Sequence, residues 1–173
     1  MSGIILLVED PKWRSHRGLL ARLTEAAQAA RRSARLKGGF TVLLTDDKRL
    51  RRLNHDFRGK DKPTNVLSFP GQDDLLNGRT AGRHAGRSRG ERPARLADAY
   101  AGDIAIAYGV TSKEAKAAAK NFADHAAHLV VHGVLHLAGY DHEAPSDAKV
   151  MEPLEVRILK RLGIADPYRP TPQ

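Results

Sequence analysis

Three histidines fall between residues 132 and 142, and their spacing constrains the fold more than any other feature of the chain. His132 and His136 are four residues apart, so a helix would place both imidazoles on one face, close enough to share a metal ion. His142 cannot lie beside them on the same straight helix, so the chain must turn back. Gly139 suits that turn, because glycine tolerates the left-handed conformation in which helices end. The run predicts a helix, a glycine turn and a metal site.

The chemistry of such a site follows from its donors. Three neutral imidazoles on a divalent ion leave a fourth position for water or substrate, as in catalytic zinc sites. The spacing H-x3-H-x5-H with a glycine three residues after the second histidine matches the zinc-binding signature of metzincin proteases. Those proteases carry a glutamate after the first histidine as general base, and Gly133 occupies that position here. The pattern therefore predicts a zincin-like metal-site helix and argues against a peptidase.

A second histidine pairing is possible on the same helix. His128 lies four residues before His132, on a helical stripe that also contains His125. Only the pair His132 and His136 is followed by a turn that can return a third histidine. We therefore expect His128 to support the site or the core rather than to bind the metal.

Composition limits the alternatives. A chain of 173 residues, 41% of them hydrophobic, suits one folded domain, here residues 1–173. The chain has no cysteine, so histidine or carboxylate must hold any metal, which fits a cytoplasmic protein. The first ten residues predict neither a signal peptide nor a membrane span.

The net charge of +9 is unevenly distributed. Residues 1–62 hold 15 Lys and Arg against 7 Asp and Glu, whereas residues 111–173 hold 8 of each. A basic face in the first part of the chain predicts a polyanionic partner, and nucleic acid bound through its phosphates is the best fit. The logarithm of such an affinity falls linearly with the logarithm of salt concentration.

Apolar patterning predicts an α+β fold with a mixed sheet of about four strands packed with helices, and no regular βαβ repeat. The predicted strands span residues 4–8, 40–45, 64–69 and 103–107, with the third near an edge because prolines flank it. The predicted helices span residues 13–36, 46–55, 111–138 with a possible break, and 146–162. Thr111 and Glu114 resemble a capping box. Pro153 should kink the last helix or mark a boundary.

Residues 71–101 differ from the rest. They contain five glycines, six arginines and almost no apolar periodicity, which predicts a flexible surface loop rich in arginine and glycine.

Two long segments carry a family resemblance. Residues 53–70, LNHDFRGKDKPTNVLSFP, resemble the L-N-x-x-Y-R-x-x-D-x-P-T-[DN]-V-L-S-F-P segment of the YbeY family of bacterial endoribonucleases. Residues 128–142, HLVVHGVLHLAGYDH, are similar to that family's H-L-x-V-H-G-x-L-H-L-x-G-Y-D-H. Residues 102–104 and 163–168 also match, so the resemblance spans about residues 40–168. Phe57 replaces the usual tyrosine, and the 71–101 loop is longer and richer in arginine than usual.

The resemblance implies a zinc-dependent, single-strand-specific endoribonuclease of the cytoplasm that acts in 16S rRNA 3′-end maturation and ribosome quality control. It implies one zinc ion with an open position, bound by His132, His136 and His142, and a catalytic role for Arg58 and His132. An arginine suits this chemistry, because its guanidinium can hold two oxygens of an anionic phosphodiester transition state. The nucleophile would be the RNA 2′-OH or a water activated by the ion.

The implied partners are single-stranded RNA and the rRNA of the small ribosomal subunit, with a small-subunit ribosomal protein and an Era-type GTPase, and no membrane. Two other functions stay open from the sequence. One is a ribosome-assembly factor that binds rRNA and protein with a structural zinc, and the other is a zinc peptidase, which Gly133 disfavours. Metal-dependent cleavage of RNA would distinguish the endoribonuclease from the assembly factor and from the peptidase.

Overall fold

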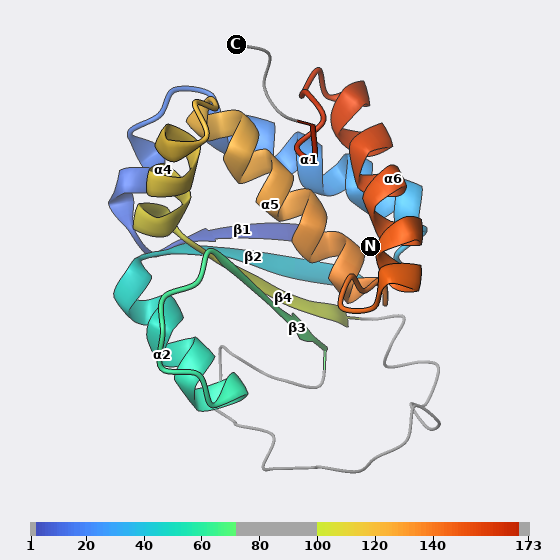
Figure 1. Cartoon of the computed structure of the whole chain (residues 1–173). Coiled ribbons are helices and arrows are strands. Elements are labelled where there is room, and N and C mark those ends of the chain that lie inside the picture. Colours follow the sequence, from blue (N-terminus) through green and yellow to red (C-terminus); the bar gives the residue numbers. More distant parts are fainter. Residues whose placement is uncertain (1–2, 72–99, 170–173) are drawn as a thin grey trace.

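A four-stranded mixed sheet with helices on both faces forms the centre of the computed structural model, which describes residues 3–71 and 100–169 (Figure 1). The strands lie in the order β1-β2-β4-β3. β1, β2 and β4 are parallel, and β3 pairs antiparallel with β4 at one edge. Their bounds are Ile4–Val8 (β1), Gly39–Thr45 (β2), Val66–Pro70 (β3) and Tyr100–Ala107 (β4). The predicted fold class and the edge position of the third strand are confirmed.

Five α-helices and one 3-10 helix pack around this sheet within the described residues. They are η1 (Pro11–Arg14), α1 (Leu19–Ala34), α2 (Asp47–Arg58), α4 (Tyr108–Ala117), α5 (Phe122–Leu137) and α6 (Pro145–Arg161). α1, α5 and α6 cover one face of the sheet, and α2 lies on the other (Figure 1). β1, α1 and β2 form one βαβ unit, and β2 then pairs with β4 rather than with the next strand in sequence.

The larger core lies between the sheet and α5, which packs against α1, α4 and α6 as well as against β3 and β4. Because α5 is enclosed on so many sides, its sequence is apolar around most of its circumference. A smaller core lies under α2, where Leu50 and Leu53 pack against Phe69 of β3. None of the described helices is both long enough and apolar enough to cross a membrane.

The N-terminal helix is shorter than predicted. Gly18 adopts a left-handed conformation (φ 75°) and separates η1 from α1, so the helical segment that begins near Trp13 is not continuous. Trp13 lies in η1, is fully buried and donates from its indole nitrogen to the carbonyl oxygen of Thr45 at 3.0 Å. Trp13 is therefore a core residue that lies outside α1.

The predicted capping role of Thr111 is wrong. α4 begins at Tyr108, directly after β4, and the Thr111 hydroxyl donates to the carbonyl oxygen of Ala107 at 2.6 Å. The first turn of α4 is instead capped from α2, because Asp47 accepts from the backbone N–H of Val110 at 2.9 Å.

Two other predictions about the C-terminal half have different outcomes. The expected break in the long helix is confirmed, since α4 ends at Ala117 and α5 begins at Phe122 with Asn121 as its N-cap. Pro153 lies inside α6 and does not mark a boundary. The predicted loop at residues 71–101 falls almost entirely outside the described residues, which resume at Tyr100 in β4.

Gly133 sets the distance between α5 and β4. A Cβ atom at this position would lie 2.7 Å from Cγ2 of Ile104, closer than real Cβ contacts come. Gly133 is buried, and Ile104 is fully buried. Position 133 therefore faces the sheet, which explains why a side chain is absent here.

We expect Gly133→Ala to lower the free energy of unfolding by about 1–2 kcal/mol, because overpacking against Ile104 outweighs the gain in helix propensity. Urea unfolding measures this change. In an Ile104→Ala background, which removes the clash, the same substitution should be neutral or stabilising. Unchanged or higher stability of Gly133→Ala in the wild-type background would contradict the packing argument.

Candidate metal centre

The C-terminal end of α5 presents two histidines on one face. His132 and His136 are one turn apart, and the helix ends at Leu137. Gly139 follows with φ 97°, and the backbone N–H of Tyr140 donates to the carbonyl oxygen of Leu135 at 3.0 Å. This is the predicted glycine turn.

The turn returns His142 to the pair. Asp141 accepts from the backbone N–H groups of His142 (2.7 Å) and Glu143 (3.3 Å), which fixes the returning loop. Those hydrogen bonds to its charged form lower the pKa of the Asp141 carboxyl. The loop is therefore held by local backbone contacts rather than by burial.

The three imidazoles converge. Their ring centroids are separated by 4.6 Å (His132–His136), 5.0 Å (His132–His142) and 5.1 Å (His136–His142). One ring nitrogen from each lies within 4.8 Å of the others, and the Nε2 atoms of His132 and His136 are only 3.0 Å apart. Nitrogens this close suit ligands that point at one ion, so the cluster could hold a metal.

The protonation state of His136 favours metal binding. Burial, followed by the nearby charges of His132 and His142, lowers the pKa of His136 to about 4. At neutral pH its imidazole is therefore uncharged, which is the form that binds metal ions.

A buried carboxylate from α6 orients His132. Glu155 is fully buried and accepts from Nδ1 of His132 at 3.2 Å, which leaves Nε2 of that ring facing His136. It also accepts from Nε2 of His128 at 2.6 Å and from the Tyr168 hydroxyl at 2.7 Å. Burial alone would raise the pKa of Glu155, but the hydrogen bonds from both histidines lower it to about 2. The carboxylate is therefore charged and can support a cationic site.

Sequence reasoning did not identify Glu155 or Tyr168. The signal for Glu155 was present, since it lies four residues after Met151 on the buried face of α6, where a charged residue is unusual. Its partners, however, lie 27 (His128), 23 (His132) and 13 (Tyr168) residues away in sequence, so no local pattern connects them.

The competing histidine group is also visible. His128, His132 and Glu155 bring one ligand atom each within 4.8 Å of one another. This group surrounds a carboxylate with no exposed area, whereas His142 of the other group is exposed. A substrate could therefore reach an ion held by the three-histidine cluster. His128 lies beside the cluster and donates to Glu155, a contact that the sequence did not predict.

The three histidines and Arg58 line one cleft, with a volume of about 620 Å³. Arg58 is the last residue of α2, which is longer than predicted, and its guanidinium donates to the carbonyl oxygen of Ser68 at 2.9 Å. The Ser68 hydroxyl donates to the carbonyl oxygen of Gly133 at 3.2 Å, linking β3 to α5. All the residues predicted to act in the site therefore lie around the same cavity.

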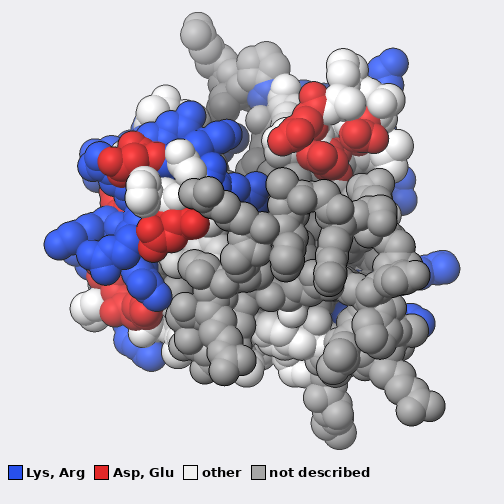
Figure 2. Space-filling model, turned by 90° about the horizontal axis from the view of Figure 1, so that it is seen from below, with Lys and Arg blue, Asp and Glu red and all other residues white. Residues whose placement is uncertain are grey.

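The cleft has walls of different charge. Lys and Arg side chains gather on the side of the molecule where α2 lies (Figure 2). Besides Arg58, the lining includes Lys60 and Lys62 on that side, and Asp141 and Glu143 on the returning loop. The histidines lie between a cationic wall and an acidic loop.

Comparisons with known proteins agree with this geometry. A family model described as Endoribonuclease YbeY matches residues 11–163. The Endoribonuclease YbeY of Chelativorans sp. (strain BNC1) is 49% identical over 152 residues, covering 88% of this chain and 82% of that protein. That of Maricaulis maris (strain MCS10) is 41% identical over 170 residues, covering 97% and 92%. The solution structure of TM1509 from Thermotoga maritima shares the fold, with a TM-score of 0.57, 23% identity and coverage of 96% and 99%.

An α+β domain with a partly exposed three-histidine cluster beside a basic wall has the arrangement of a metal-binding hydrolase. The chain belongs to the YbeY family of endoribonucleases, and it is accordingly an enzyme of the nuclease class.

We expect Glu155→Gln to weaken zinc affinity about 10–100-fold, because a neutral amide orients His132 less firmly and removes a charge that supports the ion. Competition with a chromophoric chelator measures the affinity, and circular dichroism checks the fold. The matched control is Glu152→Gln on the preceding turn of α6, which accepts no hydrogen bond from either histidine. Equal affinities for the two variants would refute the orienting role.

Proposed function

We propose that the protein is a zinc-dependent endoribonuclease that cuts single-stranded RNA, with His132, His136 and His142 as zinc ligands and Arg58 and His132 as catalytic residues. One observation carries the proposal: three convergent imidazoles and a guanidinium line the same open cleft. The family supports RNA as the substrate class.

Zinc fits the donor set. Three imidazoles with no thiolate suit a catalytic zinc ion with an open fourth position. When bound, the ion would supply Lewis acidity at the reacting phosphate. The role of His132 is to present Nε2 to the ion while Glu155 holds its other ring nitrogen.

Arg58 supplies charge at the opposite wall. Its hydrogen bond to the Ser68 carbonyl oxygen uses one terminal nitrogen and fixes the guanidinium, which leaves other N–H donors for phosphate oxygens. Lys60 and Lys62 add positive charge along the same wall and would attract the RNA backbone. The wall therefore binds the strand and orients the scissile phosphate towards the histidines.

The finer assignment follows the family resemblance. We propose that the substrate is the rRNA of the small ribosomal subunit, in 16S rRNA 3′-end maturation and ribosome quality control in the cytoplasm. A small-subunit ribosomal protein and an Era-type GTPase are the proposed partners. The single strand is favoured because its phosphate and its 2′-OH can enter the cleft without a paired second strand.

Removal of the metal tests the proposal directly. We expect a chelator to abolish cleavage of single-stranded RNA by the purified protein, and added zinc to restore it, while duplex RNA of the same sequence stays intact. Binding without any metal-dependent cleavage would instead support an assembly factor with a structural zinc.

We expect Arg58→Ala to lower turnover of single-stranded RNA by about 10²–10³-fold, as loss of one charged donor to an anionic transition state does elsewhere. Zinc content and stability should be retained, because Arg58 is exposed and fills no core. The matched control is Arg52→Ala, an exposed arginine in the same helix that does not line the cleft. Small and equal effects of both variants would rule out a catalytic role for Arg58.

A further inference from the structure

The basic residues of the first 62 positions do not form the single face that the sequence predicted. They lie on opposite faces of the sheet, because α1 packs on one face and α2 on the other (Figure 1). The cleft accounts for the charge of Arg58 at the end of α2 and of Lys60 and Lys62 after it. A second group at the C-terminal end of α1 has no part in it: Arg31, Arg32 and Arg35.

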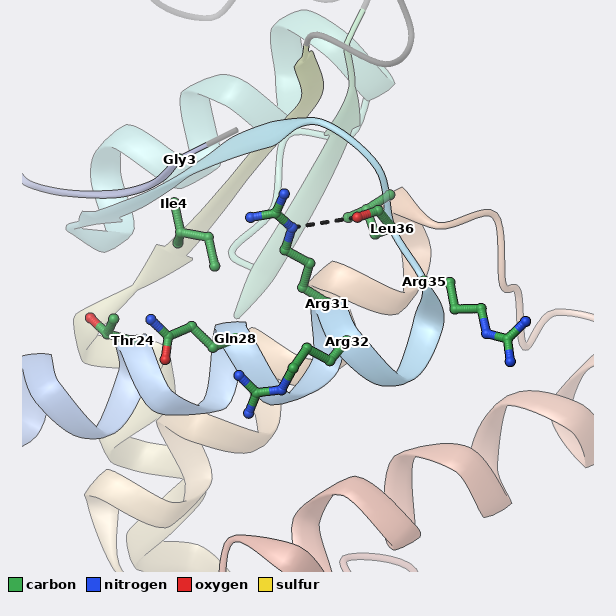
Figure 3. Close-up of a pocket in the computed structure, with 8 residues that line it drawn as sticks. All are labelled: Gly3, Ile4, Thr24, Gln28, Arg31, Arg32, Arg35 and Leu36. Carbon is green, nitrogen blue, oxygen red and sulfur yellow. Dashed lines mark hydrogen bonds between the residues drawn. The ribbon is translucent and has the colours of Figure 1, made fainter. Parts of the chain in front are cut away.

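This second group lines a groove of about 680 Å³ between the C-terminal half of α1 and the start of β1 (Figure 3). Residues four apart on a helix share a face, so Gln28 and Arg32 lie together along the groove. Arg35 lines the groove from the C-cap of α1. Ile4 and Leu36 form its apolar side.

Arg32 and Arg35 have no acidic neighbour in the groove lining. Among the residues that the structure describes, none of those lining the groove is acidic. Nε of Arg31 donates to the Leu36 carbonyl oxygen at 3.4 Å. Arg32 and Arg35 are exposed, and neither forms an ion pair within residues 3–71 and 100–169. Glu25, an acid on the same helix, faces Arg22 instead.

The backbone at Arg35 is unusual. Arg35 caps α1 in the left-handed conformation with φ 51°, and its N–H donates to the Arg32 carbonyl oxygen at 3.2 Å. Glycine is the usual residue at such a position, because a side chain there is strained. The chain therefore keeps a third guanidinium at a position where the fold alone would favour glycine.

We propose that this groove binds the phosphate backbone of single-stranded RNA at a second point, away from the metal centre. The guanidinium of Arg35 points away from those of Arg31 and Arg32 (Figure 3). Diverging guanidinium groups suit successive phosphates of an extended strand better than one small anion. The inference rests on the proposed RNA substrate.

The position of the groove decides which RNA can use it. The groove borders β1 and the cleft borders β3, at opposite edges of the sheet. Three strand spacings separate these edges, or roughly 14 Å, before any path around the surface is added. A long strand can reach both places, and an oligonucleotide that only fills the cleft cannot.

A simpler explanation makes a different prediction. Arginines near a helix C-terminus interact favourably with the last carbonyl groups, so they could serve stability alone. Their replacement would then change the free energy of unfolding and leave RNA affinity unchanged.

The test compares two double variants of the full chain. Arg32→Gln with Arg35→Gln removes two charges from the groove and leaves Arg31 in place. The control, Arg14→Gln with Arg17→Gln, removes two exposed charges near the other end of α1, about 24 Å away along a helix of this length. Binding is measured on chelator-treated protein, with polyuridine of about 30 nucleotides and of about five.

We expect the groove variant to bind the long RNA roughly 10-fold more weakly at moderate salt, with a slope of log affinity against log salt that is shallower by about 1.4. The short RNA and the control variant should bind as wild type does. A wild-type slope, an equal loss in the control, or an equal loss with the short RNA would overturn the proposal.

Two further arms separate the possible partners. Polyglutamate that competes for the groove better than polyuridine would assign it to an acidic protein and overturn the RNA proposal. Metal-dependent cleavage of the short RNA by wild type tests the proposed function by itself. Absence of that cleavage, with the long-RNA defect intact, would refute the nuclease proposal and leave the groove as an RNA site.

Discussion

The close contact between α5 and β4 is the constraint on which the site depends. Gly133 brings the helix against Ile104, and the Gly133 carbonyl oxygen accepts from Ser68 on the neighbouring strand. Because one face of α5 is fixed on the sheet in this way, the face that carries His132 and His136 lines the cleft beside β3. The position that holds the general base in zinc proteases is used here for packing.

A second constraint links the site to the C-terminal part of the chain. Glu155 has no exposed area, and a buried carboxylate is tolerated only when donors replace its lost hydration. His128, His132 and Tyr168 provide those donors, from α5 and from the segment after α6. Burial and the hydrogen bond to Glu155 raise the pKa of the Tyr168 hydroxyl, so it stays protonated and keeps donating. The orientation of one metal-facing imidazole thus depends on how α6 and the C-terminal segment pack.

Features that depend on neighbours in sequence could be predicted, and those that depend on distant partners could not. The spacing of His132, His136 and His142 around a glycine gave the turn correctly, because helix geometry alone fixes it. Thr111 was misassigned, since Asp47, far away in sequence, caps that helix. Glu155 was missed for the same reason.

The distribution of charge shows the same limit. A count over residues 1–62 shows how much positive charge is present. It does not show that α1 and α2 pack on opposite faces of the sheet, which separates their basic residues.

The charges around the cleft are consistent with a metal-dependent reaction on a phosphodiester. Arg58, Lys60 and Lys62 make one wall cationic, whereas Asp141 and Glu143 leave the loop beside His142 acidic. Without an ion, an RNA phosphate would be drawn to the α2 wall and repelled from the loop. A divalent ion held by three neutral imidazoles would reverse the charge on the loop side, so that the phosphate could lie between two positive walls. In the proposed function, occupancy of the histidine cluster would therefore draw a phosphate bound at the α2 wall towards the histidines.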